Sequence, residues 1–325
     1  MAKQLFRRRL LLVTGKGGVG KTTIAAGLAV AARDRGLNVL LVQLGKIDNI
    51  GPIFGKRIPP YKFVELEHRL TAFSIEPYLA LHEYLVNQVK VQFVVDMFLE
   101  NRVIQYLTQA APGWRELITV GKIWQIQNQT LGYRKRPRFD LIVVDAPATG
   151  HGISFLRVPA IILNTIRFGP IRRHTLEVQK LLLDPDRTLL VGVALPEEMP
   201  VNEVAEIHKA ARSMLHIPYG GTVLNAFTTP AADRETAPLL RKLLADKKAM
   251  ALVDKTVPGG AKPLLDALDT RGARAALSER YLAEIAARIG GDVFLVPMLP
   301  QARLDRESIA KVARVLDDQV EDISQ

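Results

Sequence analysis

The sequence predicts an α/β protein with a doubly wound, mainly parallel sheet and an inserted helical subdomain. Several short, almost continuous apolar runs are bounded by glycine, proline or aspartate, which is typical of parallel strands buried on both faces. Helical stretches separate these runs, so the chain alternates as βαβ units. A glycine-rich motif stands between the first run and the first helix. We expect one domain over residues 1–325, because a chain of this length can bury a sizeable core.

The expected strands are the apolar runs that end at turn-forming residues. They are Leu10–Thr14, Val39–Leu44, Leu70–Ile75, Leu141–Asp145, Thr188–Leu195, Gly221–Leu224 and Asp292–Val296. The first run follows three arginines and so imitates a signal peptide, but it is too short and continues directly into the glycine-rich motif. We therefore expect a core strand there and a cytoplasmic protein. No stretch approaches the ~18 consecutive apolar residues of a membrane span.

The glycine-rich motif fits the phosphate-binding pattern G-x-x-x-x-G-K-[ST]. It comprises Gly15, Lys16, Gly17, Gly18, Val19, Gly20, Lys21, Thr22 and Thr23. Glycines let successive backbone N–H groups turn towards a phosphate without Cβ clashes. Lys21 would place a positive charge against the β and γ phosphates, and the Thr22 hydroxyl suits Mg²⁺. A helix predicted from Ile24 to Arg35 follows, so the phosphates would lie at a helix N-terminus.

The strand Leu141–Asp145 supplies the second part of the predicted site. It delivers Asp145 to its carboxyl end, where a carboxylate can hold a Mg²⁺-bound water. Because this aspartate accompanies the phosphate motif, we interpret Thr22 and Asp145 as a metal site. The turn that follows contains Pro147, Thr149, Gly150 and His151. His151 suits packing at a helix start and, equally, a conformational relay.

One segment breaks the alternation of strands and helices. Residues 77–129 form a long helical run that is interrupted at Pro112-Gly113 and is rich in large apolar side chains. No single helical stripe holds all of them, so more than one face must be covered. We expect a helical subdomain over residues 76–135, with residues 158–184 contributing. Either these helices pack on the sheet and on each other, or they form a cap that covers a partner subunit or an apolar protein client.

Composition excludes some kinds of chemistry. The chain has no cysteine, which rules out disulfides, thiolate sites for zinc or metalloid, and a cysteine-held iron–sulfur cluster. The formal net charge is +11. The basic residues are nevertheless scattered, with small clusters at residues 7–9, 134–138 and 172–173 and no long basic tail. We interpret the excess as surface charge and expect no nucleic-acid partner.

The position of Lys16, directly after the first glycine, resembles the deviant phosphate loop (deviant Walker A, or SIMIBI type) of one group of P-loop NTPases. That group includes MinD/ParA partition ATPases, nitrogenase iron protein and the arsenite-pump (ArsA) ATPases. The turn from Asp145 to His151 is similar to the switch II sequence of the ArsA family, close to D-x-x-P-T-G-H, which partition ATPases do not share. The resemblance implies an ATP- and Mg²⁺-dependent dimer. In it Lys16 would reach the partner's nucleotide and neutralise transition-state charge in trans.

Two further segments resemble the adenine pocket of the ArsA family. Asn225 follows a strand, and its amide could both donate to and accept from adenine. The loop Val296–Pro300 offers a rigid apolar support for the base. The residues that the resemblance assigns to it are Pro297, Met298 and Leu299. The stretch Ala194–Pro200 is also similar to this family, so the resemblance covers most of the chain apart from residues 226–290.

The sequence departs from the family after the second strand. The resemblance implies an aspartate there that orients the attacking water, but anchoring on Phe54-Gly55 puts Gly45 at that position. Gln43 could position the water instead, and Asp48 could move in if the loop is remodelled. The predicted catalytic residues are therefore Lys16, Lys21, Gln43 and Asp48. Without a group that positions water, turnover would be weak, because a general base contributes about 10²–10⁴-fold.

The sequence leaves three functions open. The first is a dimeric Mg²⁺-ATPase that couples ATP binding and hydrolysis to subunit closure and to movement of a helical cap. The second is an ATP-binding subunit with weak turnover that pairs with an ArsA-like paralogue retaining the aspartate. The third is a positioning ATPase that acts on DNA or membrane, against which the switch II turn and the inserted helices argue. The dimer could be made of two copies or of two paralogues.

Overall fold

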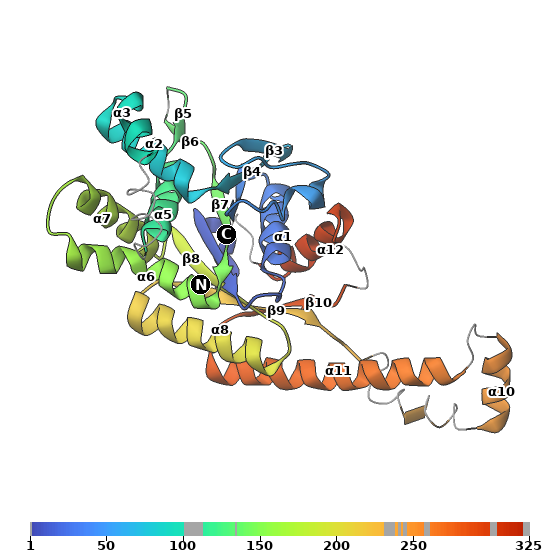
Figure 1. The fold of residues 1–325 in the computed structure, drawn as a ribbon. Helices are drawn as coiled ribbons and strands as arrows, with labels where there is room; N and C mark the ends of the chain where they lie inside the picture. Colours follow the sequence, from blue (N-terminus) through green and yellow to red (C-terminus); the bar gives the residue numbers. More distant parts are fainter. Residues whose placement is uncertain are drawn as a thin grey trace.

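The computed structural model describes residues 2–100, 113–133, 135–230, 246–256, 261–299 and 304–320, together with residues 238, 239 and 242. Its centre is an eight-stranded sheet with the order β10-β9-β8-β1-β7-β2-β4-β3 (Figure 1). Every neighbouring pair is parallel except β3 and β4. The strands are β1 (Leu10–Gly15), β2 (Val39–Leu44), β3 (Phe63–Glu67), β4 (Leu70–Ile75), β7 (Leu141–Ala148), β8 (Thr188–Ala194), β9 (Tyr219–Phe227) and β10 (Val293–Pro297). The predicted α/β fold with a mainly parallel sheet is confirmed.

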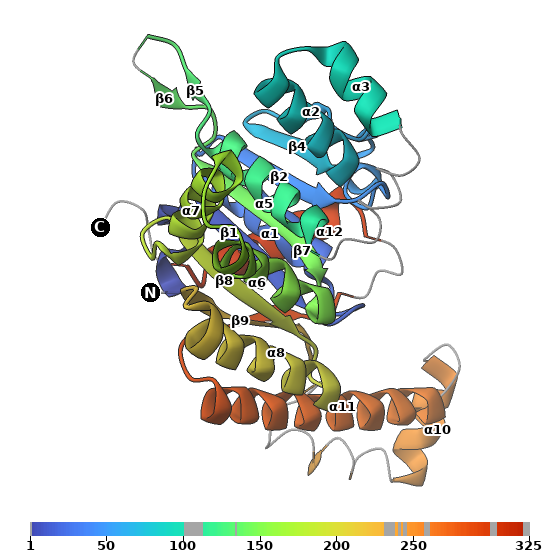
Figure 2. The same cartoon turned by 60° about the vertical axis from the view of Figure 1, so that its left-hand side comes forward.

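Helices cover both faces of this sheet, as Figure 2 shows. On one face, α1 (Lys21–Asp34) and α12 (Arg306–Asp317) pack together over Leu11 and Val13 of β1. The opposite face, which carries Leu10 and Leu12, is covered by further helices. These are α5 (Trp114–Gln127), α6 (Thr149–Thr165), α7 (Pro170–Leu183) and α8 (Glu198–Ala210), which continues into the short π-helix η3 (Ala211–Leu215). Because side chains alternate along a strand, the sheet buries apolar residues on both faces.

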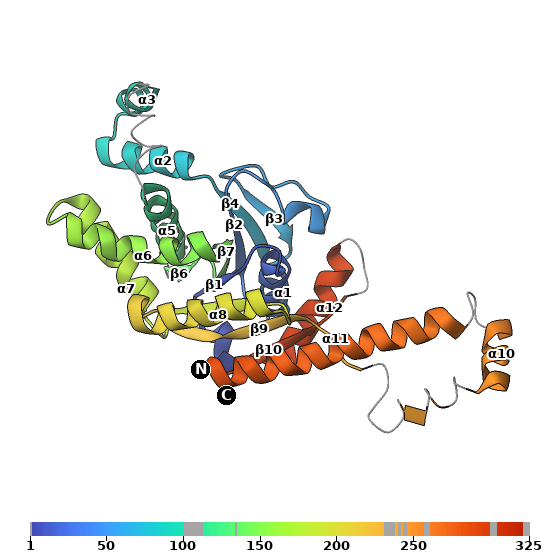
Figure 3. The ribbon, with the colours of Figure 1, turned by 60° about the horizontal axis from the view of Figure 1, so that its bottom comes forward.

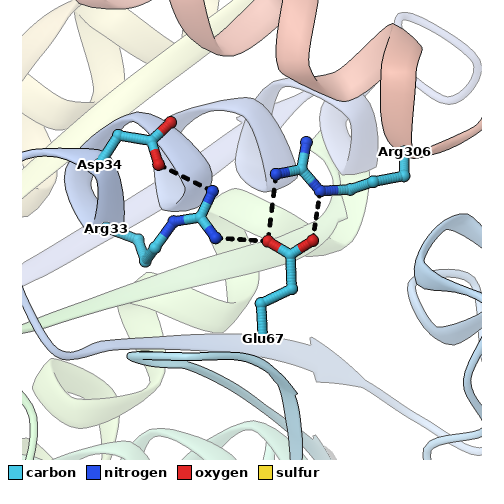
Figure 4. Close-up of polar contacts among 4 residues, drawn as sticks. All are labelled: Arg33, Asp34, Glu67 and Arg306. Carbon is cyan, nitrogen blue, oxygen red and sulfur yellow. Dashed lines mark hydrogen bonds and ion pairs between the residues drawn. The ribbon is translucent and has the colours of Figure 1, made fainter.

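The edge of the sheet holds a strand that the sequence analysis did not predict. Strand β3 forms an antiparallel hairpin with β4, and Arg69 takes a positive φ of 61° in the turn. Glu67, at the end of β3, accepts hydrogen bonds from Arg33 of α1 (2.5 Å) and from Nε of Arg306 of α12 (2.5 Å), as Figure 4 shows. Arg33 also pairs with Asp34 at 2.8 Å. This charged cluster joins the edge strand to both helices of one face.

The predicted helical segment lies between β4 and β7. It contains α2 (Pro77–Val89), α3 (Gln92–Glu100) and α5, followed by a short hairpin of β5 (Thr130–Leu131) and β6 (Arg136–Pro137). Helix α5 packs on the sheet through Val120, Ile123 and Ile126, whereas α2 and α3 stand farther out (Figure 3). Of the predicted interruption, Pro112 lies outside the described residues, and Gly113 precedes α5 with φ +84°.

The chain returns to the sheet through a long projecting helix. Helix α11 (Ala261–Arg288) packs against α8 and β9 near its C-terminal end, where Tyr281 and Ile285 are buried. Its other end points away from the sheet and carries α10 (Lys247–Thr256), as Figures 1 and 3 show. Two short 3₁₀ turns, η1 (Ala2–Arg7) and η2 (Gly51–Phe54), complete the described elements. None of the described helices combines the length and the apolar character that crossing a membrane requires.

Candidate functional site

The glycine-rich loop joins β1 to α1 at the carboxyl edge of the sheet. Gly15, Gly18 and Gly20 have φ values of +153°, +85° and +90°. A Cβ on Gly15 would lie 2.2 Å from the carbonyl oxygen of Val193, and a Cβ on Gly20 would lie 2.3 Å from Nδ2 of Asn225. The backbone contact leaves no room for a side chain at Gly15, and the positive φ favours glycine at Gly20. In contrast, a Cβ on Gly17 or Gly18 would meet nothing within 4 Å, so the loop borders open space.

Lys21 begins α1 and lies over this loop. Its ammonium donates a hydrogen bond of 2.9 Å to the carbonyl oxygen of Lys16. Burial lowers the pKa of Lys21, and the carboxylates of Asp145 and Glu203 act in the opposite direction. A cation that has lost part of its water interacts more strongly with an anion, so Lys21 suits a phosphate next to the loop. The Lys16 side chain is partly exposed.

Thr22 and Asp145 form the closest polar pair of the site. Thr22 Oγ1 donates to Asp145 Oδ2 at 2.5 Å. They meet because β7 lies next to β1 in the sheet, with Asp145 paired to Val13, so the aspartate faces the start of α1. Burial raises the pKa of Asp145, while the bond from Thr22 and the charge of Lys21 lower it. A hydroxyl and a carboxylate oxygen side by side would suit Mg²⁺, which prefers oxygen ligands and keeps several waters.

Other predicted loop residues support the backbone. Asn225 Nδ2 donates to the carbonyl oxygen of Val19 at 2.9 Å, so β9 braces the loop from the side. Val19 and Thr23 are buried. Thr14 Oγ1 donates to the carbonyl oxygen of Pro147 at 3.3 Å and joins the end of β1 to the segment after Asp145.

The rest of the predicted switch II turn is described only in its backbone. Pro147 belongs to β7, and Thr149, Gly150 and His151 form the first residues of α6. The side chains at positions 149–152 lie outside the described part of the structure. The two roles considered for His151 therefore stay predictions.

The predicted adenine loop lies next to β9. Pro297 pairs with Phe227 across β10 and β9, and the Met298 N–H donates to the carbonyl oxygen of Phe227 at 3.0 Å. The Met298 side chain is 48% exposed, whereas Leu299 packs against the core. The loop therefore follows β10 directly beside the strand that supplies Asn225, at the same edge of the sheet as the glycine-rich loop.

Gln43 and Asp48 hold the loop that follows β2. The buried Gln43 accepts hydrogen bonds from the N–H groups of Asn49 (3.1 Å) and Ile50 (3.2 Å), and its amide donates to Asp48 at 3.4 Å. Asp48 in turn accepts from the N–H groups of Gly51 and Ile58, both at 2.7 Å. In this arrangement the polar atoms of both side chains are engaged in fixing the loop backbone.

Gly45 stands at the start of the same loop. It has a φ of +98°, and a Cβ there would meet nothing within 4 Å. A larger side chain would have room at this position, although the backbone would be strained for any residue with a Cβ.

Glu203 is a contributor that the sequence analysis missed. It lies on α8, and its charge acts on Lys21. Strand β8, which precedes α8, pairs with β1 and so brings this helix close to the loop. The adjacency of strands far apart in sequence carries this information, and no local motif around Glu203 does.

Comparison of the sequence with known proteins identifies relatives of this chain. A sequence profile of the anion-transporting ATPase family (ArsA ATPase) matches residues 8–177, which include the loop and Asp145. ATPase BagA of Mycobacterium tuberculosis is 34% identical over 224 residues, which is 67% of this chain and 64% of the relative. An arsenical pump-driving ATPase of Acidiphilium multivorum is 28% identical over 217 residues, 61% of this chain and 36% of the relative. ATPase get3 of Neurospora crassa is 28% identical over 155 residues, 47% of this chain and 44% of the relative. The chain therefore spans less than two thirds of the length of these relatives.

Proposed function

The chain belongs to the anion-transporting ATPase (ArsA-type) family, and from this premise we propose that it binds Mg²⁺-ATP and hydrolyses it as a cytoplasmic dimer. One observation carries the proposal above all others. The Thr22–Asp145 oxygen pair, 2.5 Å apart, stands beside a loop in which Gly15 has no room for a side chain and Gly20 has a positive φ, and whose Gly17 and Gly18 border open space. That combination suits a polyphosphate bound by backbone N–H groups with its metal ion alongside.

Each residue of the loop then has a defined task. Lys21 would exchange its bond to the Lys16 carbonyl for the β and γ phosphates, and Thr22 and Asp145 would hold Mg²⁺ directly or through water. When bound, Mg²⁺ supplies charge neutralisation on the phosphates. Asn225, besides bracing Val19, lies at the edge where the Pro297–Leu299 loop could support adenine.

We assign Lys16 to the partner's nucleotide. Its carbonyl oxygen, and not its side chain, makes the bond to Lys21, so its partly exposed ammonium is available to reach beyond the subunit. A cation delivered in trans acts only when two subunits have closed, which would couple hydrolysis to closure. Lys16→Ala should therefore spare ATP binding and lower turnover.

Packed helices connect the Asp145 segment to the helical subdomain, so closure of the two subunits could move that subdomain. Helix α6 begins four residues after Asp145 and packs against α5 and α7, and α5 packs against α2. A shift of the Asp145 segment on binding Mg²⁺-ATP would therefore be passed to these helices. This contiguity supports movement of a helical cap as the mechanical output of the ATPase cycle.

A subunit with weak hydrolysis is the second candidate. It is favoured by the loop after β2, where Gly45 occupies the expected aspartate position and the polar atoms of Gln43 and Asp48 are engaged with the backbone. Such a subunit would bind ATP and rely on an ArsA-like paralogue for turnover. ATP hydrolysis by the chain alone, compared with the rate in the presence of that paralogue, separates the two candidates.

Nucleotide binding is tested most directly by calorimetric titration of Mg²⁺-ATP into the protein and into Lys21→Ala. A charge-assisted hydrogen bond contributes about 1.5–3 kcal/mol, so we expect a loss of affinity of roughly 10- to 150-fold. Lys255→Ala on α10, far from α1 in Figure 1, removes the same charge and should bind normally. Equal affinities for all three proteins would refute the proposed site.

A further inference from the structure

We propose that the helical subdomain binds the acyl chain of a single-chain fatty acid in a cavity between α2, α5 and α7. The cavity has a volume of about 650 Å³, which is typical of a site for a small ligand. Its walls are mainly apolar and aromatic. Among the residues that line it are Leu81, Leu85, Trp114, Leu117, Trp124 and Ile171. The proposal goes beyond ATP binding and does not depend on it.

Several polar side chains at the wall of the cavity are bonded to one another. The buried ammonium of Lys122 pairs with Glu83 at 2.6 Å, and Gln125 donates to the other oxygen of Glu83 at 3.0 Å. His174 lies 3.3 Å from the Tyr84 hydroxyl through Nδ1. Because the chain itself satisfies these atoms, the part of the cavity that they border favours hydrocarbon over a polar ligand.

The dimensions select a single acyl chain over a protein helix. The lining residues of α5 run from Trp114 to Gln125, a span of about 16 Å at 1.5 Å per residue. The hydrocarbon core of a bilayer is ~30 Å thick, so one lipid chain spans about 15 Å. A membrane-spanning helix about 10 Å wide and 30 Å long would fill roughly 2,400 Å³, several times the volume of the cavity. The cavity within one protomer therefore matches the size of a single lipid tail.

Charge at one end of the cavity complements a carboxylate. Arg115 is exposed, and its guanidinium lies 5.7 Å from the ring centre of Trp114, which lines the cavity where α5 begins. The acyl tail would extend from there towards Lys122 and Gln125. A fatty acid would thus place its tail among apolar side chains and its headgroup beside an exposed cation.

Gly121 allows a test that does not damage the fold. It lines the cavity, and a Cβ at this helical position would meet nothing within 4 Å. In Gly121→Leu a leucine side chain would occupy ligand space, and leucine also favours the helix more than glycine does. Gly272→Leu is the matched control, because Gly272 is likewise a helical glycine with open space around it, but on α11.

The experiment measures the affinity of the full-length protein for a series from octanoate to stearate, by displacement of a fluorescent fatty acid below the micellar concentration. Each buried methylene should raise affinity about four-fold, and the gain should cease between laurate and palmitate, when the chain fills the cavity. We expect Gly121→Leu to weaken laurate binding at least ten-fold and Gly272→Leu to change it less than about two-fold.

Two further variants identify the headgroup site and separate this proposal from the ATPase. Arg115→Gln should weaken laurate binding by about two- to five-fold and leave dodecanol binding unchanged. Lys21→Ala should bind laurate normally even though its affinity for ATP is lowered, so either proposal can fail without the other. Affinity that keeps rising through stearate, equal laurate binding by Gly121→Leu and the parent protein, or binding of an apolar twenty-residue helical peptide without binding of laurate would overturn the proposal.

Discussion

Glu67→Gln tests whether the charged cluster at the sheet edge stabilises the fold. The substitution keeps the size of the side chain and removes its charge. It weakens the contact with Arg33 and both contacts with Arg306, at 2.5 Å from Nε and 3.1 Å from Nη2. Arg33 keeps its contact with Asp34, and the Arg306 guanidinium stays 5.8 Å from the Phe54 ring. Both cations therefore retain a neighbour after the change.

The expected loss in free energy of unfolding is about 1–2 kcal/mol. An exposed ion pair contributes about 0.2–1 kcal/mol, and Glu67, at 27% exposure, makes two such pairs, one of them bidentate. Burial alone would raise the pKa of Glu67, but the bonds and charges of Arg306 and Arg33 outweigh it and lower the pKa. A carboxylate whose folded pKa is depressed adds stability above its unfolded pKa, and this stability is lost as the pH falls through the folded value. The difference in free energy of unfolding between the two proteins should therefore be largest at neutral pH. It should vanish in acid, below the folded pKa of Glu67.

Urea unfolding of both proteins, at neutral pH and at progressively lower pH, measures the effect. Glu65→Gln provides the control on the same strand, because Glu65 is exposed and its charge lies outside the cluster. The reasoning fails if Glu67→Gln unfolds at the same midpoint as Glu65→Gln at neutral pH, or if the difference between them persists unchanged in acid.

Three further outcomes are expected. Asp145→Asn should lose the Mg²⁺ dependence of ATP binding in titrations, yet unfold at higher temperature at neutral pH. Burial raises the folded pKa of Asp145 above the ordinary value, so the ionised carboxylate destabilises the folded protein at neutral pH. An unchanged or lower melting temperature of the variant would contradict this prediction. Position 20 has a φ of +90°, and a Cβ there would lie 2.3 Å from Asn225. Gly20→Ala should therefore lower the free energy of unfolding in urea by about 1–3 kcal/mol and abolish ATP binding. Gly17→Ala should retain the stability of the parent protein. Gly45→Asp should raise steady-state phosphate release despite the strain of φ +98°; an equal rate would mean that another group positions the water.

The sheet could be predicted because its strands are buried on both faces. Strands such as Leu10–Gly15 and Val39–Leu44 have almost continuous apolar sequences, and this pattern is independent of what lies beside them. Strand β3 alternates polar and apolar residues at an edge, and only its pairing with β4 and the arginines around Glu67 define it. The projecting position of α11 could not be predicted either, because an amphipathic pattern does not say against what the helix packs.

Local motifs located the glycine-rich loop and the Thr22–Asp145 pair, because both follow from residues at a strand end. The arrangement around Gln43 and Asp48 could not be read in this way. Their side chains bond to backbone N–H groups up to ten residues away, and only the folded loop determines which groups are within reach. The cavity could not be predicted either, because the sequence gives the apolar side chains but not the space that they leave between the folded helices.

The order of elements after β7 connects the two proposed sites. Asp145 follows the buried residues Leu141–Val144 of β7, and α6 begins at Thr149, so any movement of the aspartate is passed to this helix within four residues. Helix α6 packs against α5 and α7, which form two walls of the cavity, while β1 and the loop are held to β7 by the Thr14–Pro147 bond. A change at the phosphates therefore has a short, packed route to the cavity walls and no comparable route to α10, which packs only against α11 among the principal contacts of the described elements. Coupling between ATP and a bound acyl chain, where it occurs, must be reciprocal, so that ATP changes acyl affinity by the same factor by which the acyl chain changes ATP affinity.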